Sequence, residues 1–475
     1  MICRLVSAQK GEKMWDRLFK LSQLNTNIKT EILAGVTTFL TMSYIIFVNP
    51  QFLSFSGDPN LKGLGLPFSA CMTATCLSTA MMCILMGLWT NYPFALAPGM
   101  GLNAFVAYQI VATMGLSWPT AMGIIVIEGL VITFLVITGF REAVMNSIPL
   151  SLKQAISVGI GLFLALIGLQ SAGFIKAHPA TLVTLGDFTK LPIIVFILGL
   201  LITAILIRKE VKGALLIGII SSTIIAIIIN YLSGFKAYPG TEFARIPSSL
   251  ISPPDLSVIG KFDFLVFEKI GILTSITLIF AVMLSDFFDT LGSVIGLGTE
   301  GRFLDERGSL PRINRVLLVD SLAAAVGGAF SSSSVTTYIE SAAGISVGGK
   351  SGLTAVIVGA LFILAIFFAP FAGIVPAQAT APALIIVGFL MMTIIKEIPF
   401  HKFDEAFPAF LIMIVMPLTY SISNGIGIGF ILYVLIKLLT GKGKEVHWLL
   451  YLVSLAFAVD FAIPVLKILF ELKGG

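Results

Sequence analysis

The sequence is poor in charge. Asp, Glu, Lys and Arg make up only 12% of its 475 residues, whereas an average globular protein carries about 25%. The hydrophobic share is 57%, and the mean hydropathy is +1.01. The net charge of +5 arises from basic residues in short predicted loops, so nucleic acid is not an expected partner. The composition therefore indicates an all-α integral membrane protein in a lipid bilayer, with no sizeable water-soluble domain.

Residues that build disulfides, metal sites and enzyme centres are also scarce. Cys3 lies near the start, and the other cysteines share one apolar run, so no disulfide framework or metal site is expected: Cys71, Cys76 and Cys83. The histidines lie in predicted loops or at span ends without ligand spacing: His178, His401 and His447. The chain has no His-Glu-x-x-His motif and no second aspartate motif of the kind an intramembrane protease needs. These absences argue against a cofactor and an enzyme, including an intramembrane protease.

Long apolar segments fill most of the chain instead. Crossing about 30 Å of hydrocarbon takes roughly 17 to 25 helical residues. The pattern predicts about fourteen transmembrane segments, two of them short: residues 31–52, 67–89, 100–115, 119–140, 150–171, 191–208, 213–233, 270–295, 314–330, 335–345, 351–370, 377–395, 404–421 and 423–440. A further apolar run at residues 446–468 does not fit this count. It is either an additional span or a helix that lies at the membrane interface.

Basic residues set the expected orientation. Six of them lie within residues 1–30, which do not resemble a cleavable signal peptide and are predicted to be cytoplasmic. From that start, the loops after even-numbered spans lie inside, and they carry Lys and Arg as the positive-inside rule requires. The proline-rich loop at residues 234–269 then faces outward and separates two halves. The expected location is the cell membrane, inner or plasma.

Polar stretches interrupt the third and tenth predicted segments, at residues 91–104 (NYPFALAPGMGLNA) and 327–344 (GGAFSSSSVTTYIESAAG). Their Pro, Gly and Ser residues favour extended backbone followed by a short helix. Non-helical backbone at membrane depth is tolerated only where it is buried in protein or lines a cavity, and a matched pair of such breaks points to a transporter's binding site. The broken segments are seven apart. Because seven is an odd number of membrane crossings, two halves of seven spans would enter the membrane from opposite sides. The sequence thus predicts a 7+7 inverted repeat.

Among the acidic residues inside predicted spans, four are the candidates for a functional role: Glu128, Asp286, Asp289 and Glu340. A charge at the centre of a membrane helix costs at least about 2.5 to 3.5 kcal/mol, so each needs a reason. Asp286 and Asp289 are three residues apart and share one helix face. We expect Asp289 and Glu340 to be functional. Of these two, Glu340 is expected in the first turns of the helix that follows the break in the tenth segment. Asp286 is either functional or structural, and Glu128 is expected to make a structural hydrogen bond between helices.

Four ordered motifs carry a resemblance to a known family. They are residues 35–50 (GVTTFLTMSYIIFVNP), 97–104 (APGMGLNA), 289–292 (DTLG) and 336–341 (TTYIES). From about residue 16 onward, the chain resembles the azaguanine-type purine permeases of the nucleobase:cation symporter family, which also holds uracil, xanthine and ascorbate permeases. This resemblance implies proton-coupled uptake of adenine, guanine or hypoxanthine, often by a homodimer.

The resemblance also implies a uracil-permease-like division into two domains. A core domain comprises residues 31–140 and 270–370, and a gate domain comprises residues 150–233 and 377–440. The family's acids fall on Asp289 and Glu340, and its polar residue after the third-segment break falls on Asn103. Uracil permeases carry a histidine in the eighth segment where this chain has Thr290 or Ser293, so proton coupling through a histidine is not available.

A purine combines N–H donors and acceptor atoms on one planar ring. We expect the Glu340 carboxylate to accept two donors, and backbone N–H groups near Tyr338 and Gly101 to serve the acceptors. Asp289 is the expected proton-linked acid, and Asp286 is a second candidate for proton coupling. Further contacts are expected from Asn103, Thr337 and an aromatic ring that stacks on the purine: Phe287, Tyr338, Phe94 or Phe105.

Other transporters remain open as alternatives. A transporter of the same fold could take uracil, xanthine or a small anion, although acids in the site would repel sulfate or bicarbonate. A passive channel does not need broken helices in matched halves. Neither the preferred purine nor the choice between proton and sodium follows from the sequence.

Overall fold

A computed structural model describes residues 14–56, 61–139, 147–239, 243–247, 249, 251–305 and 310–473. The first thirteen residues of the predicted cytoplasmic segment, the end of the predicted span 119–140 and parts of the predicted loop 234–269 lie outside the described residues. Ten helical segments of the described chain are long and apolar enough to cross a membrane. The chain is therefore a helical membrane protein.

The first half contains these helices: α2 Ile28–Met42, α3 Ile45–Ser54, α4 Phe68–Thr90, α5 Met100–Ala104, the π-helix η2 Phe105–Thr113, α6 Trp118–Thr138, α8 Leu150–Ser171, α9 Leu191–Arg208 and α10 Ala214–Leu232. The second half contains these: α11 Val266–Ile270, α12 Ile272–Glu300, α13 Ile313–Ala329, α14 Ser341–Ser346, α15 Gly352–Ala365, α16 Ala369–Gly373, α17 Ala377–Met392, α18 Phe403–Thr419, α19 Ile422–Leu439 and α20 Trp448–Lys473. Short 3-10 turns occupy Lys62–Leu64, Ile366–Phe368, Thr393–Glu397 and Gly443–Glu445. The apolar run predicted at residues 446–468 is thus part of a helix, α20.

Polar side chains define several helix starts. Asn27 caps α2 by accepting a hydrogen bond from the Thr30 backbone N–H at 3.0 Å. The buried Glu31 reaches the start of α15, where its carboxylate accepts hydrogen bonds from the backbone N–H groups of Lys350 and Ser351. An acid near a helix N-terminus is stabilised by the free N–H groups and the helix dipole. The Glu31 side chain therefore connects the first predicted span to the N-terminus of the eleventh.

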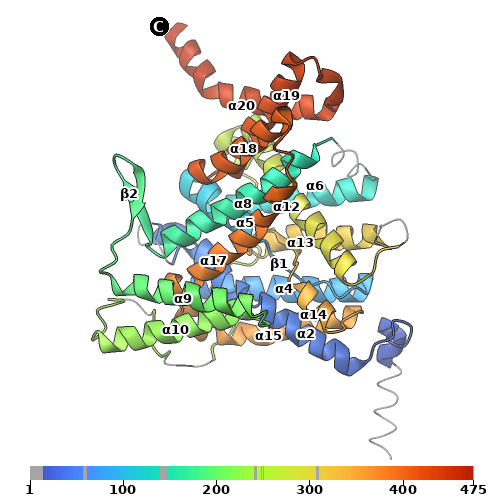
Figure 1. The fold of residues 1–475 in the computed structure, drawn as a ribbon, viewed down its shortest axis with the longest axis vertical. Coiled ribbons are helices and arrows are strands. Elements are labelled where there is room, and N and C mark those ends of the chain that lie inside the picture. The colour runs from blue at the N-terminus through green and yellow to red at the C-terminus, as the bar shows by residue number, and fades with distance from the viewer. Residues whose placement is uncertain are drawn as a thin grey trace, which may run out of the picture.

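The two predicted breaks meet at the centre of the molecule (Figure 1). Strand β1 (Leu96–Pro98) pairs with β4 (Val335–Thr337) in an antiparallel register that sets Ala97 opposite Thr336. The backbone N–H of Gly99 extends this ladder by donating to the Ser334 carbonyl at 2.9 Å. Buried peptide groups that leave a helix must find partners, and each break supplies them to the other. The extended backbone and following helices, α5 and α14, match the sequence prediction.

Two sets of helices pack around this centre. One set joins α4 to α15 and α6 to α13, and the other joins α8 to α17 and α18 and α9 to α10. Glycine allows the closest approaches, because a Cβ at Gly87 would lie 2.3 Å from the Gly352 carbonyl oxygen, and one at Gly161 would lie 2.6 Å from that of Gly388. Small residues at contacts are how membrane helices gain close packing. A hairpin of β2 (Ile175–His178) and β3 (Leu182–Leu185), exposed to solvent, lies in a region predicted only as a loop.

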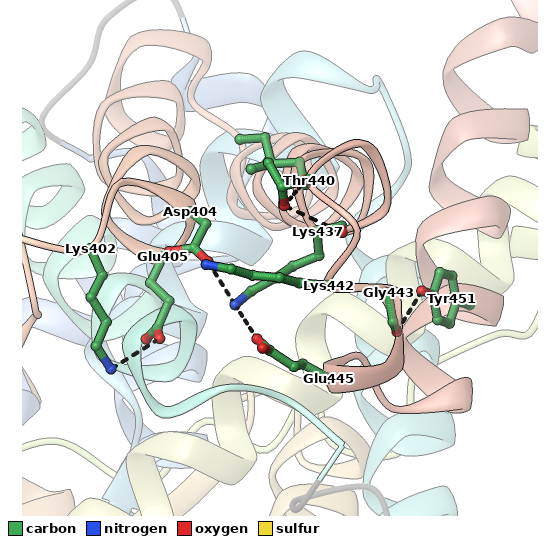
Figure 2. Close-up of polar contacts among 10 residues, drawn as sticks. Lys402, Asp404, Glu405, Lys437, Thr440, Lys442, Gly443, Glu445 and Tyr451 are labelled. Atoms are coloured by element: carbon green, nitrogen blue, oxygen red, sulfur yellow. Dashed lines mark hydrogen bonds and ion pairs between the residues drawn. The ribbon is translucent and has the colours of Figure 1, made fainter.

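The ion pairs of the described residues gather at one place, where α18, α19 and the 3-10 turn Gly443–Glu445 meet (Figure 2). The Lys437 ammonium lies 2.8 Å from the Asp404 carboxylate and 2.7 Å from the Glu445 carboxylate. Lys442 reaches Asp404 at 2.9 Å. The charged side chains thus pair at a helix end, away from the acids of the central region.

Candidate functional site

A cavity lies beside the paired breaks. The residues that line it come from the two breaks, α12, the second helix set and the junction of α2 with α3: Tyr44, Met100, Gly101, Leu102, Ile160, Ser285, Asp289, Ser293, Thr337, Tyr338, Ile339, Glu340, Val387 and Met391. Five of the seven predicted substrate contacts are in this lining. They are Gly101, Asp289, Thr337, Tyr338 and Glu340.

Asp289 enters the cavity from the middle of α12. Its carboxylate is partly exposed there, and it accepts no hydrogen bond from the described residues. A Cβ added to Gly99 would lie 3.7 Å from Oδ2 of Asp289, so the carboxylate sits against the turn that leads into α5. The acid of α12 and the first break therefore face the same space.

The sequence predicted Glu340 inside the first turns of the helix, but the residue lies directly before α14. The reason is that the turn between β4 and α14 extends through residue 340, so the helix begins at Ser341. The Tyr44 hydroxyl donates a 2.7 Å hydrogen bond to Oε1 of Glu340, and Thr41 donates to the Glu340 carbonyl at 3.3 Å. The carboxylate is thereby held from α3 and α2 while remaining on the cavity.

Tyr338 differs from its predicted role in one respect. Its backbone N–H is not available to a ligand, because it donates to the Ala95 carbonyl at 2.9 Å and continues the β1–β4 ladder. Its hydroxyl donates to the Pro98 carbonyl at 2.6 Å, which joins the second break to the first. Its ring lies in the cavity wall, 6.5 Å from the Tyr44 ring centre. On the other break, the N–H groups of the first turn of α5 have no partner inside the helix.

Three predicted residues lie outside the cavity lining. Asn103 is fully buried, and its side-chain N–H donates to the Pro98 carbonyl at 3.3 Å. Phe287 packs edge to face on Phe288, with ring centres 5.7 Å apart. Asp286 is buried and accepts a 3.2 Å hydrogen bond from the Ser334 hydroxyl. The two alternative stacking residues are also in the core, at Phe94 and Phe105.

Sequence reasoning missed two residues that shape the site. Asp320 of α13 is buried and accepts three hydrogen bonds: from the Thr290 hydroxyl at 2.5 Å, the Thr337 N–H at 2.8 Å and the Thr337 hydroxyl at 2.7 Å. It therefore fixes β4 to α12 and α13. The signal was present, because Asp320 is an acid inside the predicted span 314–330. Tyr44 was part of a motif, but nothing in the sequence connects it to Glu340.

The opposite wall of the cavity is apolar and comes from α8 and α17. Ile160 of α8 lies so close to α5 that a Cβ at Gly101 would be 2.4 Å from its Cγ2. Val387 and Met391 of α17 complete this wall. The cavity thus lies between the broken segments, which supply acids and tyrosines, and the second helix set, which supplies apolar side chains. Among the described residues, no group of acids, histidines or cysteines is arranged to hold a metal ion.

Solved membrane-protein structures share this fold. The transmembrane domain of the cyanobacterial bicarbonate transporter BicA superimposes with a TM-score of 0.59 at 14% identity, covering 84% of this chain and 97% of that one. The murine anion transporter Slc26a9 superimposes with the same TM-score at 10% identity, covering 87% of this chain and 69% of that one. At such low identity these matches establish a shared membrane-transporter fold.

Sequence comparison gives the family. The sequence model of a family described as a permease family matches residues 29–428. The chain is 40% identical to the adenine permease AdeP of Escherichia coli over 97% of both chains, and 40% identical to the guanine/hypoxanthine permease PbuG of Bacillus subtilis over 93% of this chain and 98% of that one. It is 43% identical to a putative permease of Methanocaldococcus jannaschii over 94% of this chain and 98% of that one. The chain belongs to the xanthine/uracil permease family, and it is a transporter rather than an enzyme.

Proposed function

We propose that the protein takes up purine nucleobases by proton symport, with the purine bound in the cavity between the broken segments. The observation that carries the proposal is that two carboxylates, Asp289 and Glu340, face one cavity beside the paired strands β1 and β4. Relatives named for adenine and for guanine/hypoxanthine transport, similar over nearly their whole length, support the choice of substrate.

Glu340 is suited to recognise the donor edge of a purine. The Tyr44 hydroxyl already donates a hydrogen bond to Oε1 of Glu340, so Oε2 of this carboxylate is left to accept one from a ligand. Charge-assisted hydrogen bonds are roughly twice as strong as neutral ones, and they strengthen further where water is excluded. The free N–H groups of the first turn of α5 complement this by donating to ring nitrogens or a carbonyl of the purine. The side chain of Tyr338 supplies an aromatic face in the wall between them.

Asp289 is suited to carry the coupled proton. It lines the cavity without a hydrogen-bond donor from the described residues, so no donor in that part of the chain favours its ionised form. No Lys or Arg lies in the cavity lining to neutralise it. A proton taken up from one side and released to the other would couple purine movement to the proton gradient.

The arrangement of helices supports alternating access by a 7+7 inverted repeat of fourteen segments. Moving each segment seven places along maps the contact between α4 and α15 onto that between α13 and α6, and maps α9–α10 onto α18–α19. It also maps β1 with α5 onto β4 with α14. We assign residues 31–140 and 270–370 to a core domain and residues 150–233 and 377–440 to a gate domain. The cavity then lies between the two domains, where their relative motion can open it to either side.

The remaining assignments follow from the loop charges. We place the protein in the cell membrane with residues 1–30 in the cytoplasm and the loop 234–269 outside, in keeping with the positive-inside rule. α20 contributes Asp460, which accepts hydrogen bonds from Thr274 and Thr277 of α12, so this last helix is attached to the start of α12. Assembly as a homodimer stays a prediction.

Transport of an anion is the alternative that the fold alone would allow, since the structural neighbours include a bicarbonate transporter and an anion transporter. Two carboxylates in the cavity oppose it by charge repulsion. The test is uptake of radiolabelled adenine, guanine, hypoxanthine, uracil, xanthine and bicarbonate by proteoliposomes, with and without an imposed pH gradient. Purine uptake enhanced by an inwardly directed proton gradient is expected. Uptake of uracil or bicarbonate alone would refute the proposal.

A further inference from the structure

We propose that Glu128 and Asp286 form a proton-binding site separate from the purine cavity, in which two carboxyl groups share one proton. Glu128 lies on α6 and Asp286 on α12, and neither residue lines the cavity. The inference rests on the proposed proton symport and adds a second place, besides Asp289, where a proton binds. It replaces the structural role that the sequence suggested for Glu128.

The pair is sealed from water. The side chain of Glu128 is 0% exposed and that of Asp286 is 1% exposed. The helices around Glu128 are tightly packed, because a Cβ at Gly129 would lie 2.3 Å from the backbone nitrogen of Ala325 on α13. An ionised carboxylate in such surroundings is costly unless donors surround it.

Donors are missing around Glu128. Neither of its carboxyl oxygens has a hydrogen-bond donor among the described residues. The Asp286 carboxyl lies within hydrogen-bonding reach of it and receives only the Ser334 hydroxyl as a donor. Two ionised carboxylates present acceptors alone, so they cannot satisfy each other. One added proton turns one carboxyl into a donor and removes the repulsion between two like charges.

The acids on neighbouring elements add to the need for a proton. Asp289 lies one turn further along α12, and Asp320 on α13 contacts the same helix through the Thr290 hydroxyl. Asp320 is satisfied by three hydrogen bonds of its own, and Glu340 is held by Tyr44. Asp460, from α20, bonds to threonines at the far end of α12. None of these groups supplies a donor to Glu128.

Three cations on elements that pack against α6 and α12 are engaged elsewhere. Lys269 of α11 donates to the Ser117 and Thr120 hydroxyls at the start of α6. Lys153 of α8 lies 5.7 Å from the Phe288 ring centre. Lys437 of α19 belongs to the ion pairs of Figure 2. Within the described part of the chain no ion pair reaches Glu128 or Asp286, so a proton is the available neutralising charge.

The pair is mechanically close to the substrate site. Ser334, which donates to Asp286, precedes β4 directly, and its carbonyl accepts from the Gly99 N–H at the start of α5. If purine binding shifts the paired strands β1 and β4, the hydrogen bonding of Asp286 changes with them. This contact provides a route by which purine binding alters the proton affinity of the pair.

The test is the ratio of protons to purine moved into proteoliposomes, measured with a trapped pH indicator and radiolabelled purine. In Glu128→Gln the amide keeps a donor for Asp286, so a purely structural role predicts the wild-type ratio. A proton-binding role predicts a ratio lower by at least about twofold, because the pair no longer needs a proton. Ser454→Ala, which removes another buried oxygen without a partner, is the matched control and should keep the wild-type ratio.

The outcomes separate this inference from the proposed function. If the wild-type protein moves purine without protons, the symport proposal fails first. If the wild-type protein is coupled and Glu128→Gln has the same ratio, the shared-proton site is refuted. Should Glu128→Gln not fold, Asp286→Asn takes its place with the same expectation. Infrared difference spectra give a second readout: the wild-type protein should show a protonated-carboxyl band that the variant lacks, and no such band in the wild-type protein would also overturn the inference.

Discussion

The Tyr44 hydroxyl donates a 2.7 Å hydrogen bond to Oε1 of Glu340, although the two residues are 296 positions apart. The contact joins the helix pair α2–α3 to the second break. It fixes one oxygen of the carboxylate and so sets the direction of the other. Tyr44 is therefore a positioning residue for the cavity as well as part of its wall.

Replacing this phenol tests the positioning. Tyr44→Phe removes a hydrogen bond to a charged group, which is worth about 1.5 to 3 kcal/mol, so purine affinity should fall by roughly tenfold or more. Equilibrium binding of radiolabelled purine to the purified protein measures this. Tyr231→Phe, on an exposed position of α10, is the control and should bind as the wild type does. Equal affinities for both variants would remove Tyr44 from the site.

Glu340→Gln tests the carboxylate itself. The amide keeps the shape of the side chain but replaces an acceptor oxygen with a donor, so a charge-assisted bond to the purine is lost. Affinity should fall by about tenfold or more. Glu300→Gln, exposed at the end of α12, is the matched control. Binding of unchanged affinity by Glu340→Gln would show that the purine is held elsewhere.

Asp289→Asn separates coupling from movement of the purine. The amide resembles the protonated acid, so exchange of purine across the membrane should remain detectable while accumulation driven by a pH gradient is lost. Counterflow and gradient-driven uptake in the same proteoliposomes measure the two activities. Asp187→Asn, exposed between β3 and α9, serves as the control. Persistent gradient-driven accumulation in Asp289→Asn would assign the coupled proton to another group.

Gly101→Ala tests the contact between α5 and α8. The new methyl group would lie 2.4 Å from Cγ2 of Ile160, so one helix must move and the cavity must change shape. Transport should fall strongly. The double variant Gly101→Ala, Ile160→Ala restores the space and should recover a large part of the activity. No recovery in a correctly folded double variant would mean that the glycine is needed for another reason.

Asp320→Asn tests the anchor of β4. The change weakens three hydrogen bonds, to Thr290 and to two groups of Thr337, and the cost of a charged hydrogen bond is about 1.5 to 3 kcal/mol. The thermal unfolding midpoint in detergent should drop by several degrees. Glu300→Gln, exposed at the end of α12, should leave it unchanged. An Asp320→Asn variant with an unchanged unfolding midpoint would show that β4 is held by its backbone hydrogen bonds to β1 alone.

Much of the framework was readable from the sequence because membrane helices and their interruptions leave strong local signals. Apolar length marked the helices, and Pro98, Gly99 and the serine run 331–334 marked the breaks. Asp289 and Glu340 stood out because charge is costly in a membrane. These signals are all local in the chain.

Contacts between distant segments were not readable in the same way. Nothing local indicates that Tyr44 bonds Glu340 or that the Tyr338 N–H is used by Ala95. The side-chain directions of Asn103 and Phe287 also depend on packing that spacing alone does not reveal. Asp320 is a different case, since the rule that found the other acids applies to it equally.

A structure determined with a bound purine tests the central claim most directly. In the presence of whichever purine the proteoliposomes take up, density for the ring is expected between Glu340, Asp289 and the first turn of α5. A second polar cavity, of about 530 Å³ and lined by Gln109, Asn424 and Asp460 among others, provides the contrast. Purine density in that cavity, with the space beside Glu340 and Asp289 left to water, would contradict the proposed site.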